Sequence, residues 1–201
     1  MKPIVLDLET SGLDKVNCGI WQIGAIDLND NEEFLEESRI DESDSVEEGA
    51  LEVIGKTEEE LRDSNKQSQK ELLEKFFQWV EKRSVKNFLC QNPQFDITFL
   101  ELKAIKYGLD IPFKYKAFDS HTIAQTICHK IHGRFLFKDG RSKFSLGKIL
   151  EFVGMEDNRQ AHNALEDCKL TAECFSRLIY GKNLFEEYSQ FKIPEVFKKW
   201  T

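Results

Sequence analysis

Four carboxylates and one histidine occupy positions in this sequence where acidic side chains are unusual. Asp7 and Glu9 lie in the apolar run PIVLDLETSGL, and Asp96 follows the apolar segment that ends at LCQNPQFD. Asp167 comes five residues after His162 in AHNALEDC. Buried carboxylates are costly unless they bind a metal or find polar partners, and hard divalent cations prefer oxygen ligands. These residues therefore predict a site for divalent cations.

The segments around these residues predict an α/β protein. PIVLDLE is a nearly continuous apolar run, which is typical of a strand covered on both faces. IWQIGAIDL and EEFLEESRI follow as a second and a third strand, joined by short polar turns that indicate antiparallel pairing. VKNFLC and KAFDS are predicted as the fourth and fifth strands. We expect a central mixed five-stranded sheet, with its first three strands antiparallel, flanked by helices.

Helices are predicted between and after these strands. They are expected over residues 57–82, with Thr57 as the cap, over 96–107 with Gly108 as terminator, and over 121–131, 145–154 and about 163–180. In the last helix, the apolar stripe predicts that Leu165, Cys168, Ala172, Phe175 and Ile179 face inward.

This arrangement allows acids that are far apart in sequence to meet. Asp7 and Glu9 are two residues apart on one strand, so their side chains leave the same face. Asp96 follows a strand at its C-terminal end, where α/β sheets usually bind ligands. Asp167 falls in the first turn of the last helix. His162 would lie about 140° from it on an ideal helix, so we expect His162 in the loop before the helix, where it suits a proton carrier better than a ligand.

Length and composition predict one domain over residues 1–180, followed by an aromatic tail at 181–201. The tail is expected to pack on the domain or on a partner. Its apolar residues are Phe185, Tyr188, Phe191, Val196, Phe197 and Trp200. Five cysteines without a CxxC pair, no apolar run long enough for a membrane span and no signal-peptide pattern indicate a cytoplasmic protein. Cys128, His129 and His132 lack the accompanying cysteine pair expected of a zinc site.

Charge is distributed unevenly along the chain, whose formal net charge is −8. Residues 27–48 hold eleven acids and one base, Arg39, and are interpreted as a solvated face, with a partner surface as the alternative. Residues 130–148 hold six bases and one acid, and include Phe135 and Phe137. This basic segment is either solvated or in contact with phosphates.

The motifs resemble those of the DnaQ-like exonucleases of the DEDDh group. DLETSGL, NPQFD and the spacing of His162 and Asp167 occur in the order typical of that family, and the resemblance covers roughly residues 3–180. ALEVIGKT at 50–57 and FDSHTIAQ at 118–125 are similar to further family segments. The related group that uses tyrosine places it four residues before the last aspartate, where this chain has Asn163. The chain therefore resembles the histidine class.

The resemblance implies a ribonuclease H-like fold and hydrolytic removal of nucleoside monophosphates from 3′ ends. It implies two divalent cations, Mg²⁺ or Mn²⁺. Asp7, Glu9 and Asp167 match the ligands of the first, whereas Asp7 and, through water, Asp96 match those of the second. His162 matches the general base. The predicted contacts to the terminal nucleotide are Thr10, Leu13, Val53, Asn92 and Phe95. One departure is Gln91, where the family usually has a histidine.

The residue types suit this chemistry independently of the family. Hydrolysis of a phosphodiester requires attack by water on an anionic phosphorus and release of an alkoxide, and two cations can stabilise both oxygens. A histidine can accept the proton of the water near neutral pH. The expected substrate is the 3′ end of single-stranded DNA, with short RNA as the alternative. A polymerase subunit is a further possible partner, a polymerase-docking module of the same fold is the alternative function, and the oligomeric state stays open.

Overall fold

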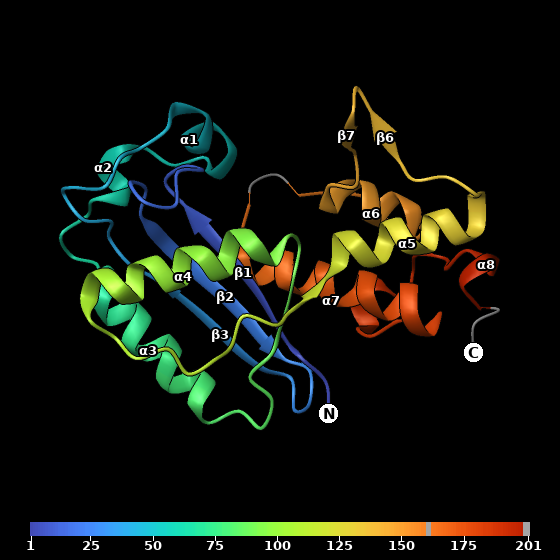
Figure 1. Cartoon of the computed structure of the whole chain (residues 1–201), viewed down its shortest axis with the longest axis horizontal. Helices are drawn as coiled ribbons and strands as arrows, with labels where there is room; N and C mark the ends of the chain where they lie inside the picture. Colours follow the sequence, from blue (N-terminus) through green and yellow to red (C-terminus); the bar gives the residue numbers. More distant parts are fainter. Residues whose placement is uncertain (160–161, 199–201) are drawn as a thin grey trace. The chain divides into compact units, whose positions relative to one another are not determined.

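A mixed five-stranded sheet forms the centre of the first part of the chain (Figure 1). The structure is a computed structural model and describes residues 1–159 and 162–198. The strands are β1 (Ile4–Thr10), β2 (Ile20–Asp27), β3 (Glu32–Glu37), β4 (Phe88–Cys90) and β5 (Phe118–Asp119). Their order is β3-β2-β1-β4-β5, with β1–β2 and β2–β3 antiparallel and β1–β4 parallel. The predicted mixed sheet with an antiparallel start is confirmed.

Eight α-helices, one 3-10 turn and a small hairpin complete the described residues. The helices are α1 (Glu48–Ile54), α2 (Glu58–Leu61), α3 (Gln69–Glu81), α4 (Pro93–Tyr107), α5 (Ser120–His132), α6 (Leu146–Phe152), α7 (Ala164–Tyr180) and α8 (Glu195–Lys198). The 3-10 turn is η1 (Glu186–Tyr188), and the hairpin pairs β6 (Phe137–Lys138) with β7 (Arg141–Ser142). Neither α1 nor the hairpin is predicted from the sequence, and the strands of the hairpin are too short to show a clear alternation.

The prediction of a continuous helix over 57–82 is wrong. Thr57 caps the short α2 and Ser68 caps α3, and each forms a capping box with the glutamate three residues later. Because a capping residue has an extended backbone, Ser68 marks the start of a new helix. The inward stripe predicted for α7 is also wrong in part, since Ile179 is exposed whereas Leu170, Cys174 and Leu178 are buried.

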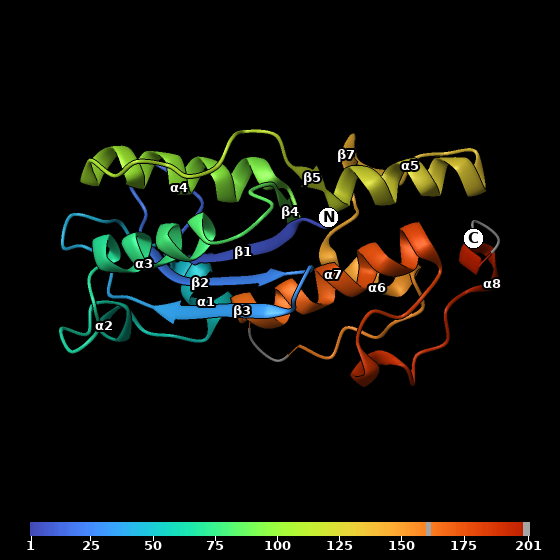
Figure 2. The same ribbon diagram turned by 90° about the horizontal axis from the view of Figure 1, so that it is seen from below.

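The two faces of β1 and β2 carry different kinds of side chain. On one face, alternate residues such as Leu6, Leu8 and Ile23 belong to a core cluster with α3 and α4. Figure 2 shows α3 and α4 together on this side of the strands. Since side chains alternate along a strand, Asp7 and Glu9 point to the opposite face. On these strands the sheet therefore separates the apolar core from Asp7 and Glu9.

The chain divides into two compact units. The first comprises Met1–Phe118 with the described residues of Gln160–Cys168, and the second comprises Asp119–Arg159 with the described residues of Lys169–Thr201. In the second unit, Ile193 and Phe197 of the tail are buried in a cluster with α5, α6 and α7, whereas Trp200 lies outside the described residues. The boundary near residue 180 stays a prediction.

The interpretation of residues 27–48 as a solvated face is wrong for several of its acids. Asp27 and Asp44 are buried. The ion pairs of the segment join Asp30 and Glu32 to Arg83, Glu36 to Lys75, Glu37 to Lys66, Asp41 and Asp44 to Lys106, and Asp44 to Lys103. Much of the acidic charge is therefore neutralised within the first unit. No described helix is both long and apolar enough to cross a membrane.

Candidate active site

Two carboxylates leave the same face of β1 beside two unusual residues of β2. Asp7 and Glu9 lie opposite Gly24 and Gln22, respectively, in the antiparallel register. Glu9 is buried and Asp7 is partly exposed. Paired residues of neighbouring strands point to the same side of a sheet. Gly24 and Gln22 therefore belong to the carboxylate face.

These two β2 residues allow the start of α7 to lie directly on the sheet. A Cβ atom at Gly24 would come within 2.3 Å of the Ala164 carbonyl carbon, so only glycine leaves room for the helix backbone. The Gln22 Oε1 accepts a hydrogen bond from the Ala164 N–H at 2.8 Å. The Cys168 thiol donates to the Gly24 carbonyl at 3.2 Å. This contact brings Asp167, in the first turn of α7, to the carboxylates of β1.

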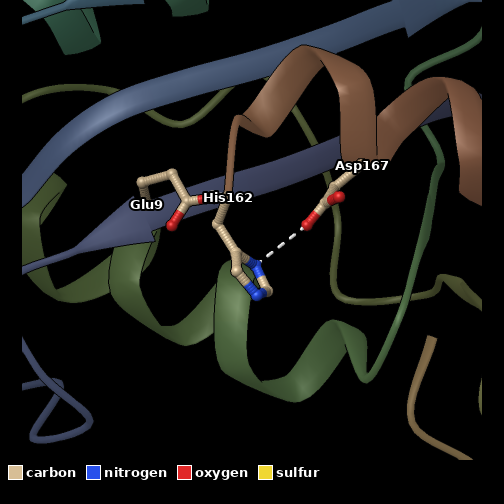
Figure 3. Close-up of side chains that lie close together, drawn as sticks. All are labelled: Glu9, His162 and Asp167. Atoms are coloured by element: carbon tan, nitrogen blue, oxygen red, sulfur yellow. Dashed lines mark ion pairs between the residues drawn. The ribbon is translucent and has the colours of Figure 1, made fainter. Parts of the chain in front are cut away.

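Glu9, His162 and Asp167 converge at this contact. Each offers one ligand atom, and the three atoms lie within 4.8 Å of one another. Figure 3 shows the His162 ring directed toward Asp167, with Glu9 coming from β1. The His162 Nδ1 is 3.1 Å from the Asp167 Oδ2. His162 precedes α7 and is more exposed than Asp167, so its ring is held by a buried carboxylate while part of it contacts solvent.

Asp96 approaches β1 from the first turn of α4. Its Oδ1 accepts a hydrogen bond from the Leu8 N–H at 3.2 Å. Leu8 lies between Asp7 and Glu9, beyond the residues of β1 that pair with β4. Burial, together with the charge of Glu9, raises the pKa of Asp96 well above its usual range. A cation near Asp96 would favour its ionised form.

The donor set fits a hard divalent cation. It consists of carboxylate oxygens and one imidazole, and it lies in a partly buried position. Burial and the charge of Asp7 raise the pKa of the neighbouring Cys168 thiol well above its usual range, so this sulfur stays protonated. Because the thiolate and not the thiol is the metal ligand, Cys168 does not favour a soft metal at this site. Glu9, His162 and Asp167 thus offer the ligand atoms that lie close together, and the assignment of Asp7 and Asp96 as further metal ligands stays a prediction.

The residues predicted to contact the terminal nucleotide differ in their exposure. Leu13 is 72% exposed and Val53 is 51% exposed, so neither is a core residue. Asn92 is exposed and has a left-handed backbone (φ 65°) at the start of α4. Such strained conformations in residues other than glycine occur often at functional sites. Phe95 is partly exposed beneath the Lys15 ammonium, and Thr10 is buried, with its hydroxyl donating to the Gly12 carbonyl.

The loop that presents Leu13 is held against the segment before α1, which presents Val53. The Ser11 hydroxyl donates to the Ser45 carbonyl at 2.6 Å, and the Glu47 N–H donates to the Ser11 carbonyl at 2.8 Å. A Cβ at Gly12 would come within 2.5 Å of the Glu47 side chain. Leu13 and Val53 therefore lie on segments that are hydrogen-bonded to each other, in the same unit as the carboxylates.

Sequence reasoning missed Gly24 and Gln22. The available signal was a glycine inside the apolar strand IWQIGAIDL, because glycine in a strand interior often marks the close approach of another backbone. The identity of the approaching element, α7, depends on a contact across about 140 residues of chain. The strand pattern alone does not contain that information.

Replacement of Gly24 by alanine is expected to lower turnover about 10²-fold, because a displacement of about 1 Å in catalytic groups has effects of this size. The added methyl group would displace the backbone of Ala164 and with it His162 and Asp167. The measurement is steady-state kinetics on a labelled oligonucleotide, with the melting temperature recorded alongside. The matched control is Gly49→Ala, because a Cβ at Gly49 meets nothing within 4 Å. Turnover of the Gly24 variant within about threefold of wild type would contradict this account of α7.

Comparisons with known proteins agree with the fold and the motifs. The chain is 29% identical over 177 residues to the PolC-type DNA polymerase III of Thermotoga petrophila and 27% identical over 179 residues to that of Caldanaerobacter subterraneus. Each match covers 88% of this chain but only 12% and 11% of the relative. The chain thus spans about an eighth of the length of these curated relatives.

Solved structures share the fold at low sequence identity. The cell-death related nuclease CRN-4 superposes with a TM-score of 0.68 at 18% identity, over 90% of this chain and 64% of that one. Escherichia coli exonuclease I in complex with a dT13 oligonucleotide gives 0.68 at 18% identity, over 88% and 41%. The nuclease domain of 3′hExo, a DEDDh family member bound to rAMP, gives 0.63 at 16% identity, over 95% and 94%.

The sequence profile of the RNase T exonuclease family matches residues 4–175, which include all the carboxylates described above. This match covers most of the chain and includes the segments that carry the DnaQ-like motifs. The chain therefore belongs to the RNase T family of DnaQ-like exonucleases.

Proposed function

We propose that this chain is a 3′→5′ exonuclease that releases nucleoside monophosphates from the 3′ end of single-stranded DNA. The convergence of Glu9, His162 and Asp167, with ligand atoms within 4.8 Å of one another, is the observation that supports this proposal most directly. Carboxylates and a histidine in this arrangement are suited to metal-assisted phosphodiester hydrolysis.

In this proposal His162 accepts the proton of the attacking water. Its Nδ1 lies 3.1 Å from the Asp167 carboxylate, which fixes the orientation of the ring and stabilises the imidazolium that forms. Its partial exposure lets the proton pass on to solvent. A neutral histidine near pH 7 is suited to this task because its ordinary pKa is about 6.5.

Asp7, Glu9, Asp96 and Asp167 would hold two divalent cations, Mg²⁺ or Mn²⁺. Bound there, the cations would supply charge stabilisation to the attacking and the leaving oxygen. The hydrogen bond from the Leu8 N–H holds Asp96 in place, and the contact between α7 and Gly24 holds Asp167 in place. These contacts order the carboxylates before a substrate binds, which lowers the cost of assembling the site.

Exposed side chains beside the carboxylates would bind the terminal nucleotide. Leu13 and Val53 are large apolar residues in contact with solvent, and such residues can separate the last base from its neighbour. We assign Thr10, Asn92 and Phe95 to the same nucleotide, because Thr10 ends β1, Asn92 lies between β4 and α4, and Phe95 lies in the first turn of α4. An unpaired end suits this arrangement better than a duplex, because its last base is free to leave the stack.

DNA is the preferred substrate in this proposal. PolC-type relatives are DNA polymerases and exonuclease I was solved with a DNA oligonucleotide, which favours DNA and also a polymerase subunit as partner. The 3′hExo nuclease domain was solved with rAMP, which favours RNA as the second candidate. Recognition of ribose depends on a contact to the 2′-hydroxyl, so the choice is one of local geometry.

A paired degradation assay tests the proposal. Matched 5′-labelled single-stranded DNA and RNA are incubated with the protein and Mg²⁺ or Mn²⁺, beside an EDTA control. We expect a ladder that shortens from the 3′ end, is faster on DNA and disappears with EDTA, because the carboxylates need a cation to act. Folded protein that degrades neither strand would refute the exonuclease and favour a docking module of the same fold. Faster degradation of RNA than of DNA would make RNA the preferred substrate and DNA the second candidate.

A further inference from the structure

A basic and aromatic groove lies within the second unit, formed by the end of α5, the β6–β7 hairpin and the start of α6. Its volume is about 1030 Å³. We call it the hairpin groove and define it by Arg134, Phe135, Phe137, Lys138, Lys143 and Lys148, which are among its lining residues. None of these residues belongs to the carboxylate site, and all of them lie in the second compact unit.

The charge of the hairpin groove is opposite to that of the whole chain. Four of its described lining residues are bases, and the acid that lines it, Glu151, is bound to Lys148 at 2.7 Å. The chain as a whole has a net charge of −8. A local excess of positive charge in an acidic protein attracts a polyanion to that surface and not to the rest of the molecule.

Aromatic side chains stand exposed beside these bases. Phe135 is 47% exposed and Phe137 is 61% exposed. The His129 ring stacks on Phe135 with 4.4 Å between centroids, and the two phenylalanine rings lie 6.0 Å apart. Exposed rings next to a basic groove are the arrangement on which unpaired bases stack. A purely electrostatic surface for duplex phosphates would not need such rings.

The hairpin is ordered by hydrogen bonds from α5. The buried Gln125 donates to the Leu136 carbonyl at 3.0 Å and to the Ser142 hydroxyl at 2.5 Å, and it accepts from the Leu136 N–H at 2.9 Å. The His121 Nε2 also contacts the Ser142 hydroxyl, at 2.5 Å. A buried amide therefore joins the helix to β7 and to Leu136, the residue just before β6. A surface ordered in this way loses little entropy when it binds a ligand.

We propose that the hairpin groove is a second binding surface for single-stranded nucleic acid, at which Lys138, Lys143 and Arg134 contact phosphates and Phe135 and Phe137 stack on bases. This inference deepens the proposed function and rests on it for the identity of the polymer. The surface would bind internal nucleotides of a strand and would contribute affinity without taking part in hydrolysis.

The test is binding of a fluorescently labelled 20-nucleotide oligo(dT) to the full chain in EDTA, measured by anisotropy between 50 and 200 mM KCl. Lys138→Ala/Lys143→Ala is expected to weaken binding about tenfold and to reduce the salt slope by about 1.4, since each phosphate contact to a single strand contributes about 0.7. Phe135→Ala/Phe137→Ala is expected to weaken binding about fivefold or more. Lys70→Ala/Lys82→Ala, which removes two exposed lysines of the α3 region, is the control and should bind as wild type does.

Turnover of a labelled trinucleotide separates this inference from the proposed function. The hairpin variants change no residue of the carboxylate site and should cleave the trinucleotide at the wild-type rate. If the hairpin variants bind the 20-mer more weakly than wild type, but the wild-type chain cleaves no oligonucleotide, the result would support the groove and refute the exonuclease. If the affinity of the hairpin variants for the 20-mer is within twofold of that of wild type, the inference is overturned. Phe135 and Phe137 would then be assigned to contact with a protein partner. A loss of trinucleotide cleavage equal to that of binding would overturn it as well.

Discussion

Replacement of Asp167 by asparagine is expected to lower the turnover of a single-stranded oligonucleotide by about 10³-fold or more. The carboxylate of Asp167 would hold a cation whose stabilisation of the transition state amounts to several kcal/mol, and about 1.4 kcal/mol corresponds to a tenfold change in rate. The same carboxylate lies 3.1 Å from the His162 Nδ1 and orients that ring. One substitution thus removes a metal ligand and the support of the general base.

The fold should tolerate this change. Asparagine has the shape of aspartate, and Asp167 is buried close to Glu9 and His162. Removal of one of several neighbouring buried acids relieves repulsion among them in the metal-free protein. We therefore expect the melting temperature in EDTA to be unchanged or higher. A rise in melting temperature on addition of Mg²⁺ is expected for wild type and should be smaller for the variant.

Steady-state kinetics and thermal unfolding, measured on the same preparation, check this prediction. The control is Glu166→Gln, because Glu166 precedes Asp167 in the first turn of α7 but is exposed. That variant loses the same charge from the same helix end, so any general effect of the helix dipole appears in both. An Asp167 variant that keeps more than about a tenth of wild-type turnover would exclude it as a metal ligand.

Most of the sheet was predictable because β1, β2 and β4 are short apolar runs bounded by polar residues. The third strand, β3, has only Phe34 and Leu35 between glutamates, and its prediction depended on the short polar turn after β2. The period of two along β1 was enough to place Asp7 and Glu9 on one face, as the register with β2 shows. The five-residue spacing from Asp167 was enough to place His162 before α7. These are local properties, since strand alternation and helix geometry hold whatever the rest of the chain does.

The parts that were not predictable depend on contacts between distant segments. The approach of α7 to β2 at Gly24 and Gln22 requires knowledge of which helix crosses which strand. Asp96 accepts a hydrogen bond from the Leu8 N–H because β4 ends early, and the sequence near Asp96 does not encode that end. The ion pairs of the acidic segment at 27–48 are not predictable for a similar reason, since its counterions lie on α3 and α4 and in the loop that joins α2 to α3.

Asp44, in this acidic run, is the partner of a fully buried lysine. The Lys103 ammonium is 3.0 Å from the Asp44 Oδ1, and the Lys103 side chain is 1% exposed. Lys106 contacts the same oxygen at 3.0 Å. Burial raises the pKa of Asp44, but hydrogen bonds from Lys106 and Lys103 lower it more, so that it lies below its ordinary value of 3.8. The ion pair is therefore intact at neutral pH.

Replacement of Asp44 by alanine is expected to lower the free energy of unfolding by about 3–5 kcal/mol, because it leaves a buried charge without its counterion. The loss should be nearly constant between about pH 5 and 8, since the carboxylate is ionised throughout that range. Urea denaturation at several pH values measures it. Glu42→Ala removes an exposed acid two residues away and should change the free energy by no more than about 0.5 kcal/mol.

The double variant Asp44→Ala/Lys103→Met distinguishes an unpaired charge from a lost packing contact. If the cost of the single variant comes from the buried ammonium, replacement of Lys103 by an apolar side chain of similar length should restore most of the stability. If the double variant is as unstable as Asp44→Ala, the contacts of Asp44 with other residues account for the loss. A single variant within about 1 kcal/mol of wild type would contradict the buried ion pair itself.

The position of this ion pair connects stability with the active site. Lys103 follows Asp96 by seven residues on α4, which is close to two helical turns, so both side chains lie on the same side of the helix. The Asp44–Lys103 pair would thus hold the helix whose first turn presents Asp96 to β1. We expect the Asp44→Ala protein that remains folded at low temperature to show a weaker increase in melting temperature with Mg²⁺ than wild type, because a less firmly held α4 presents Asp96 less accurately to the cation.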